Sequence, residues 1–66
     1  MTFREVVAIL KADGWQLDRQ TGSHRQYRHP TKPGTVTVAA HSLGKDVKPG
    51  TLGSIWKQAG LKEPNR

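Results

Sequence analysis

The sequence predicts one α+β domain of order α-β-β-β-α, with two helices packed on one face of a three-stranded antiparallel sheet. Apolar residues recur at helical spacing near both ends of the chain, and three short strand-like stretches separated by Gly and Pro lie between them. Each of these stretches has an apolar side that needs a partner, and a two-layer arrangement buries all of them together. At 66 residues, the chain is expected to form a single domain over residues 1–66.

The first helix is expected at residues 3–12. The sequence Thr2-Phe3-Arg4-Glu5 has the form of a capping box, in which Thr2 accepts from the amide of Glu5 and Glu5 reaches back. The apolar stripe of this helix consists of Phe3, Val6, Val7 and Leu10. Gly14 is expected to end the helix, because glycine takes the left-handed conformation without strain.

The first strand is expected at residues 15–19. Its residues alternate with period two, which places Trp15 and Leu17 on the core side. The loop Thr21-Gly22-Ser23 then predicts a short hairpin turn, with Gly22 at the residue that needs a positive φ.

The second and third strands are expected at residues 24–29 and 35–40, joined by a loop that contains two prolines and a glycine. Tyr27 faces the core from the second strand, and Val36 and Val38 do so from the third. Three polar residues of the second strand point the other way: His24, Gln26 and Arg28. This side of the sheet is therefore expected to be free of helices.

The second helix is expected to begin near Pro49, because proline suits the first helical turn. Its apolar stripe consists of Leu52, Ile55, Trp56 and Ala59. Gly60 is expected to end it. Residues 41–48 are expected to form a polar connection.

The chain is strongly basic, with eleven Lys and Arg residues against five Asp and Glu residues and a formal net charge of +6. The basic excess begins after residue 13, which favours a nucleic-acid partner, although a solvated basic surface is the plainer alternative. The absence of cysteine excludes disulfides and cysteine-based zinc sites. No apolar stretch approaches about 18 residues and no signal peptide is visible, so we expect a cytoplasmic protein without a membrane partner.

The apolar pattern also predicts how the second and third strands pair. If Tyr27 lies opposite Val36, His24 lies opposite Ala39 on the face away from the helices. His41 has the same parity, and it would be the diagonal neighbour of His24 with Cα atoms about 7–8 Å apart. The sequence thus predicts two histidines close together at one end of the sheet.

Histidines and arginines on an uncovered sheet face suit RNA cleavage without a metal ion or cofactor. The ribose 2′-OH can attack its own phosphate when a base removes its proton and an acid protonates the leaving 5′-oxygen. His24 is the candidate catalytic residue, and His41 is a possible second proton-transfer group. The candidate RNA- or phosphate-binding residues are Ser23, Arg25, Arg28, Lys32, Lys48 and Thr51.

These residues also have structural explanations. A surface histidine in a hairpin is more often inert than catalytic, and the arginines could simply position a phosphate. His29 precedes a proline in a loop and is expected to have no role. Trp15 and Trp56 fall on apolar faces, so they are expected in the core and not as platforms for bases.

Several short motifs occur along the chain in a fixed order. They are Gly14-Trp15 with Arg19, Gly22-Ser23-His24 with Tyr27, Val36-Thr37-Val38 before His41, and Gly50-Thr51-Leu52 before Gln58-Ala59-Gly60-Leu61. In this order and spacing they resemble the HicA (YcfA-like) toxin family over nearly the whole chain. Ala39 stands where this family commonly has a proline, and Gly53 stands where it commonly has a basic residue.

The resemblance implies more than the spacing shows. Members of this family have a fold similar to a double-stranded RNA-binding domain, and they act as mRNA interferases in type II toxin–antitoxin pairs. It implies that His24 is the catalytic residue and that a HicB-like antitoxin covers the site. We accordingly expect a monomer when free and a hetero-oligomer with the antitoxin.

Two alternatives to an endoribonuclease remain open on the sequence. The chain could be a non-catalytic RNA-binding module of the same fold, which predicts salt-sensitive binding with the RNA left intact. It could also be an interaction subunit whose basic face docks an acidic partner.

Overall fold

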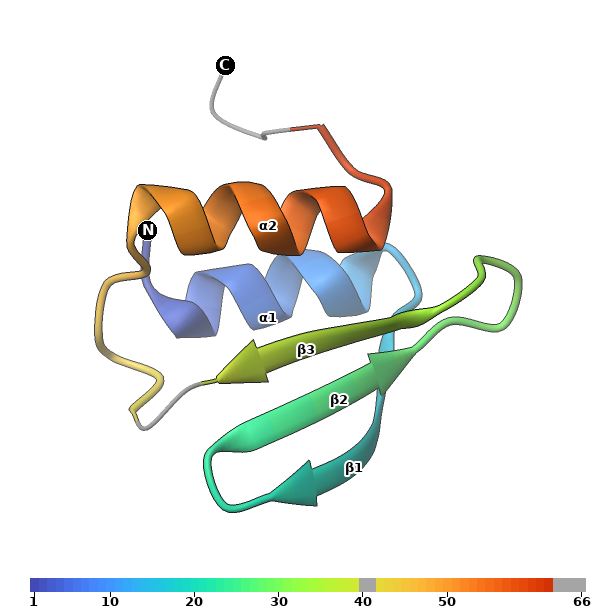
Figure 1. The fold of residues 1–66 in the computed structure, drawn as a ribbon, viewed down its shortest axis with the longest axis horizontal. Helices are drawn as coiled ribbons and strands as arrows, with labels where there is room; N and C mark the ends of the chain where they lie inside the picture. The colour runs from blue at the N-terminus through green and yellow to red at the C-terminus, as the bar shows by residue number, and fades with distance from the viewer. Residues whose placement is uncertain (40–41, 63–66) are drawn as a thin grey trace.

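The computed structural model describes residues 1–39 and 42–62, and its elements follow the predicted order (Figure 1). They are α1 (Phe3–Ala12), β1 (Gln16–Thr21), β2 (His24–Arg28), β3 (Thr35–Ala39) and α2 (Pro49–Ala59). The three strands form one antiparallel sheet in the order β1-β2-β3. Both helices lie on the same side of this sheet (Figure 1), so the predicted α+β architecture is confirmed.

The capping box predicted at the start of α1 is present. The amide of Glu5 donates to Thr2 Oγ1 over 3.2 Å, and the amide of Thr2 donates to Glu5 Oε1 over 2.8 Å. The two intervening amides donate to carbonyl oxygens in the connection between β3 and α2: Phe3 N to Lys45 O and Arg4 N to Leu43 O. This connection therefore satisfies the free amides that a helix start leaves over.

β2 and β3 pair in the predicted register. Tyr27 lies opposite Val36, and His24 lies opposite Ala39. Tyr27 is 1% exposed and Val36 is completely buried. A slip by one residue would turn these side chains into solvent, which is why the apolar pattern determines the pairing.

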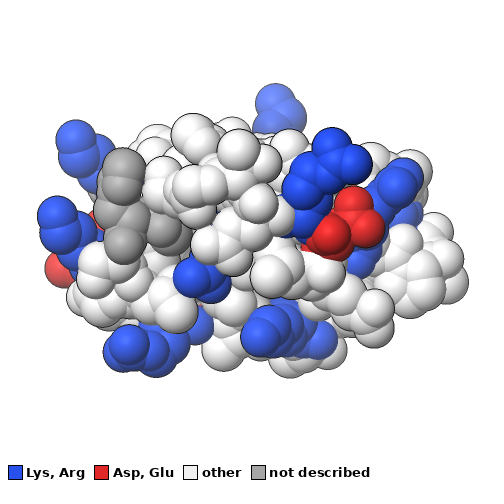
Figure 2. All heavy atoms as spheres, turned by 90° about the horizontal axis from the view of Figure 1, so that it is seen from below, with Lys and Arg blue, Asp and Glu red and all other residues white. Residues whose placement is uncertain are grey.

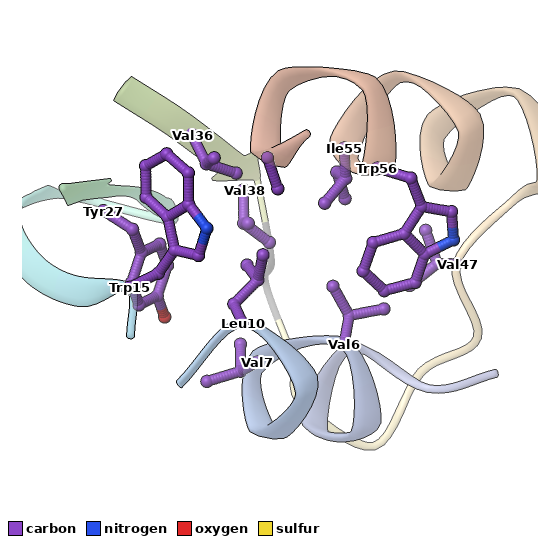
Figure 3. Packing of buried hydrophobic residues seen from close by; sticks show 11 residues of the cluster. Val6, Val7, Leu10, Trp15, Tyr27, Val36, Val38, Val47, Ile55 and Trp56 are labelled. Carbon is purple, nitrogen blue, oxygen red and sulfur yellow. The ribbon is translucent and has the colours of Figure 1, made fainter. Parts of the chain in front are cut away.

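The core fills the space between the sheet and the two helices (Figure 3). Trp15 and Tyr27 lie toward one end of it, and Trp56 and Val47 lie toward the other. Its buried members are Val6, Val7, Leu10, Trp15, Tyr27, Val36, Val38, Val47, Ile55, Trp56 and Ala59. Val47 was not predicted, because it lies in the connection expected to be polar, and it is nevertheless 5% exposed.

Leu17 lies on the core side of the sheet, as predicted, but it is not buried in the core. Leu17 pairs with Tyr27, but 47% of its surface remains exposed. The physical reason is its position: β1 is an edge strand, whereas α2 packs against β3 at the other edge. Leu17 therefore stays exposed at this edge of the sheet, away from α2, although its place in the alternating pattern of β1 is that of a core residue.

α2 begins at Pro49 and ends at Ala59, and its C-cap Gly60 adopts a φ of +66°. The buried residues of its apolar stripe are Ile55, Trp56 and Ala59. Beside this stripe, Gln58 Oε1 accepts a hydrogen bond from the amide of Thr37 over 3.2 Å. The helix therefore also covers an amide of β3, the second edge strand of the sheet.

Candidate functional site

His24 is the first residue of β2 and follows directly on the hairpin turn. Gly22 has a φ of +58°, as the first central residue of a type II′ turn requires, and Ser23 is the second. His24 pairs with Thr21 on one side and with Ala39 on the other. It therefore lies in the middle strand at one end of the sheet, and its side chain is exposed.

The alternation of side chains along β2 determines which residues share a face with His24. Because buried Tyr27 points toward the helices, His24, Gln26 and Arg28 point away from them. We call the paired residues on this side the open face: Gln16, Arg19, Thr21, His24, Gln26, Arg28, Thr35, Thr37 and Ala39. The open face carries basic, amide and hydroxyl groups, and it contains no acidic and no large apolar residue.

Arg25 lies on the opposite side of the sheet from His24. It pairs with Val38, which is completely buried, so its side chain leaves the sheet on the helix side. Its Nε atom is buried and has no hydrogen-bond partner among the described residues. Of the two arginines predicted to bind phosphate in β2, the structure therefore places only Arg28 on the same face as His24.

Lys32 takes part in a structural ion pair. Its Nζ atom donates to Asp13 Oδ2 over 2.5 Å and to the carbonyl oxygen of Ala59 over 3.2 Å, at the C-terminal end of α2. The hydrogen bond from Lys32 holds the pKa of the Asp13 carboxyl below its usual value. Lys32 thus joins the ends of both helices and is not part of the open face.

His29 has a structural role, so the prediction that it has none is wrong. Its Nδ1 atom accepts from the amides of Thr31 and Lys32 over 3.1 and 3.0 Å. Nε2 is therefore the donor, and it lies 2.6 Å from the carbonyl oxygen of Asp13. The ring also meets Trp15 edge-on with centroids 5.1 Å apart. His29 thereby fastens the loop after β2 to the end of α1.

The remaining predicted site residues lie near the start of α2. Lys48 is the N-cap of α2 and Thr51 lies in its first turn. Both are exposed, and no side chain in the described part of the chain caps the start of this helix. Figure 1 shows the start of α2 at the same end of the molecule as the β1–β2 hairpin. The two lie in different layers, because α2 belongs to the helix layer and the hairpin to the sheet. His41 lies outside the described residues, so its pairing with His24 stays a prediction.

The surface reflects the basic composition. On the face seen from below Figure 1, Lys and Arg side chains are spread widely and acidic side chains are few (Figure 2). Within residues 1–39 and 42–62, no group of three or more His, Asp or Glu residues could hold a metal ion. None of the helices described is both long and apolar enough to cross a membrane.

When the sequence is compared with models of known protein families, one match includes all the described helices and strands. A family model described as "HicA toxin of bacterial toxin-antitoxin" matches residues 3–61, whereas a comparison with curated proteins found no match. The matched range runs from the first residue of α1 to the residue after Gly60, and it includes the hairpin that presents His24. Because the match extends over both helices and all three described strands, this chain belongs to the HicA toxin family of bacterial toxin–antitoxin systems.

Proposed function

We propose that this protein is an endoribonuclease, an mRNA interferase that cleaves RNA without a metal ion and so inhibits translation. One observation carries the proposal: in a chain of a toxin family, an exposed histidine stands at the end of a polar, basic sheet face. His24 is the catalytic residue in this proposal. Exposure leaves its ring free for a substrate, since among the described residues it has no hydrogen-bond partner.

The chemistry is a transesterification within the RNA. A base removes the proton from a ribose 2′-OH, the 2′-oxygen forms a bond to the adjacent phosphorus, and the bond to the 5′-oxygen of the next nucleotide breaks. An acid protonates that 5′-oxygen, so the products are a 2′,3′-cyclic phosphate and a 5′-OH end. Histidine can act as the base or the acid near neutral pH, which accounts for the choice of His24. DNA lacks the 2′-OH and would not be cleaved.

The other residues supply binding and a second proton transfer. Arg28 lies on the open face, and Ser23 forms the turn beside His24. In this proposal both residues hold the RNA backbone. Lys48 and the first turn of α2 at Thr51 add a basic surface and a helix start at the same end of the molecule. His41 remains the proposed second proton-transfer group on the sequence alone.

Membership of a toxin–antitoxin family implies an antitoxin partner. We propose a HicB-like antitoxin that covers the open face and forms a hetero-oligomer with a toxin that is otherwise monomeric. The formal charge of +6 favours an acidic partner surface. Because the proposed substrate is mRNA, the action is placed in the cytoplasm.

The test uses purified protein, single-stranded RNA and EDTA, with the DNA of the same sequence beside it. We expect cleavage of the RNA alone, leaving 2′,3′-cyclic phosphate ends. His24→Gln keeps a polar side chain of similar reach but cannot transfer protons, so the cleavage rate should fall by about 100-fold or more. Undiminished cleavage by a folded His24→Gln protein would show that another residue is catalytic. Intact RNA that is bound in a salt-sensitive manner would identify a binding module instead.

A further inference from the structure

The pairing of β1 with β2 is interrupted by a β-bulge. Leu17 lies opposite Tyr27, and the next pair joins Arg19 to Gln26, so that Asp18 is the additional residue on β1. Regular pairing resumes after this point and continues to the hairpin turn. The bulge therefore changes which residues of β1 share a face with His24.

The change of parity brings Arg19 to the open face. In a regular strand the residue after Leu17 would lie opposite Gln26, which would put Asp18 in that place. Arg19 would then lie opposite Arg25, on the helix side of the sheet. With the bulge, a basic residue and not an acidic one lies opposite Gln26.

Of the two arginines on the open face, Arg19 lies nearer to His24 by strand geometry than Arg28 does. His24 pairs with Thr21, so Arg19 is its diagonal cross-strand neighbour, about 7–8 Å away between Cα atoms. Arg28 lies four residues along β2 from His24, which is about 13 Å at roughly 3.3 Å per residue. A guanidinium group on a long side chain easily spans the shorter of these distances.

Arg19 also has no competing charge partner within residues 1–39 and 42–62. Its side chain is exposed, and among the residues that the structure describes no carboxylate lies within ion-pair distance of it. The two ion pairs of the described chain use Met1 with Asp46 and Lys32 with Asp13. The guanidinium of Arg19 is therefore available to a ligand.

We propose that Arg19, turned onto the open face by the bulge, binds the phosphate at which His24 acts. This inference rests on the proposed function and assigns a residue to it. The planar guanidinium donates two parallel hydrogen bonds to the non-bridging phosphate oxygens, and it stabilises the additional negative charge that they carry in the transition state. The ligand class is an RNA phosphodiester, and Gln26, which pairs with Arg19 across the two strands, is a neighbouring hydrogen-bonding group on the open face.

The experiment compares Arg19→Gln with Arg4→Gln. Both substitutions remove one positive charge from an exposed arginine, but Arg4 lies on α1 and not in the sheet. A third variant, Arg19→Lys, keeps the charge and loses the planar fork. Cleavage is measured as kcat/KM, and binding is measured as the Kd of a 2′-O-methyl oligoribonucleotide, which cannot be cleaved. Circular dichroism and thermal unfolding verify that each variant is folded.

We expect Arg19→Gln to lower kcat/KM by about 100-fold, Arg19→Lys to lie between it and the wild type, and Arg4→Gln to change it by about twofold or less. Arg19→Gln should also raise the Kd and reduce the slope of log Kd against log salt by about one. Equal Kd and equal kcat/KM for Arg19→Gln and Arg4→Gln would overturn the proposal, as would wild-type protein that binds no RNA. If the wild type binds but cleaves nothing while Arg19→Gln weakens binding more than Arg4→Gln does, the phosphate contact stands and the endoribonuclease proposal fails.

Discussion

Replacement of Gly14 by alanine should destabilise the fold much more than a glycine-to-alanine change elsewhere. Gly14 has a φ of +104°, and an added Cβ atom would lie 2.7 Å from Nε2 of His29 and 3.3 Å from two of its ring carbons. The ring cannot withdraw freely, because Nε2 is bonded to the carbonyl oxygen of Asp13 over 2.6 Å and the ring packs edge-on against Trp15. Gly14→Ala therefore forces both a strained backbone and a displaced histidine.

The cost can be worked out from these contacts. A side chain at an unfavourable positive φ costs roughly 1–3 kcal/mol, and loss of the hydrogen bond between His29 and Asp13 costs roughly 1 kcal/mol. A total near 3 kcal/mol is a large part of the about 3–10 kcal/mol expected for 66 residues. Since 1 kcal/mol corresponds to about 4–8 °C in a domain of this size, the midpoint of thermal unfolding should fall by about 12–24 °C.

The assay is thermal and urea unfolding followed by circular dichroism and tryptophan fluorescence. Gly53→Ala is the matched control, because Gly53 lies inside α2 with an ordinary φ and no atom within 4 Å of an added Cβ. This variant should be more stable than the wild type by about 1 kcal/mol. In the double variant with His29→Ala the clash disappears. The double variant should therefore lose less stability than the sum of the losses measured for the two single variants. A Gly14→Ala protein as stable as the wild type, or strict additivity with His29→Ala, would refute this reasoning.

Three further predictions concern single residues. Asp13→Asn should lower the free energy of unfolding near pH 7, because the hydrogen bond from Lys32 lowers the pKa of Asp13 and so stabilises the fold only while the carboxyl is ionised. The difference from wild type should shrink as the pH falls below about 4 and through the lowered pKa. A difference in the unfolding midpoint that stays the same from neutral to acidic pH would contradict this. Arg25→Met should leave the rate of RNA cleavage within about twofold of wild type and should not lower the midpoint of thermal unfolding. The reason is that Arg25 lies on the helix side of the sheet and that its buried Nε has no partner among the described residues. A large loss of kcat/KM would show that Arg25 contacts the RNA. Deletion of Asp18 should preserve folding and cleavage, because Leu17 and Arg19 then pair with their present partners as consecutive residues; loss of cleavage by the folded deletion variant would show that the bulge itself is needed.

The helices and the central pairing could be predicted from the sequence because the information is local and redundant. The capping box at Thr2, the glycine after each helix and the alternating valines of β3 each act within a few residues. The pairing of Tyr27 with Val36 needs only that both be buried, and this condition also places His24 on the open face. The position of His24, the principal candidate residue, could therefore be predicted from the sequence.

The parts that could not be predicted depend on contacts between distant segments. Leu17 alternates like a core residue, and only the arrangement of the layers shows that no helix covers it. Lys32 and His29 look like free basic groups until the end of α1 supplies their partners at Asp13.

The bulge at Asp18 leaves no local mark in the sequence, so the sharing of a face by Arg19 and His24 could not be predicted. A bulge is a feature of the pairing between two strands, because two residues of one strand lie opposite one residue of the other. Alternation along one strand alone therefore assigns every residue after the bulge to the wrong face of the sheet.

The two edges of the sheet limit how copies of this protein could pair with one another. On β3, the side chain of Gln58 already occupies the amide of Thr37, and α2 packs along the strand. β1 is the other edge, and none of the described residues pairs with its outer side. A strand from outside would therefore add beside β1. Two copies joined there would each use β1, which is the uncovered edge among the residues that the structure describes, so such an assembly would close at a dimer and would not extend into a fibre.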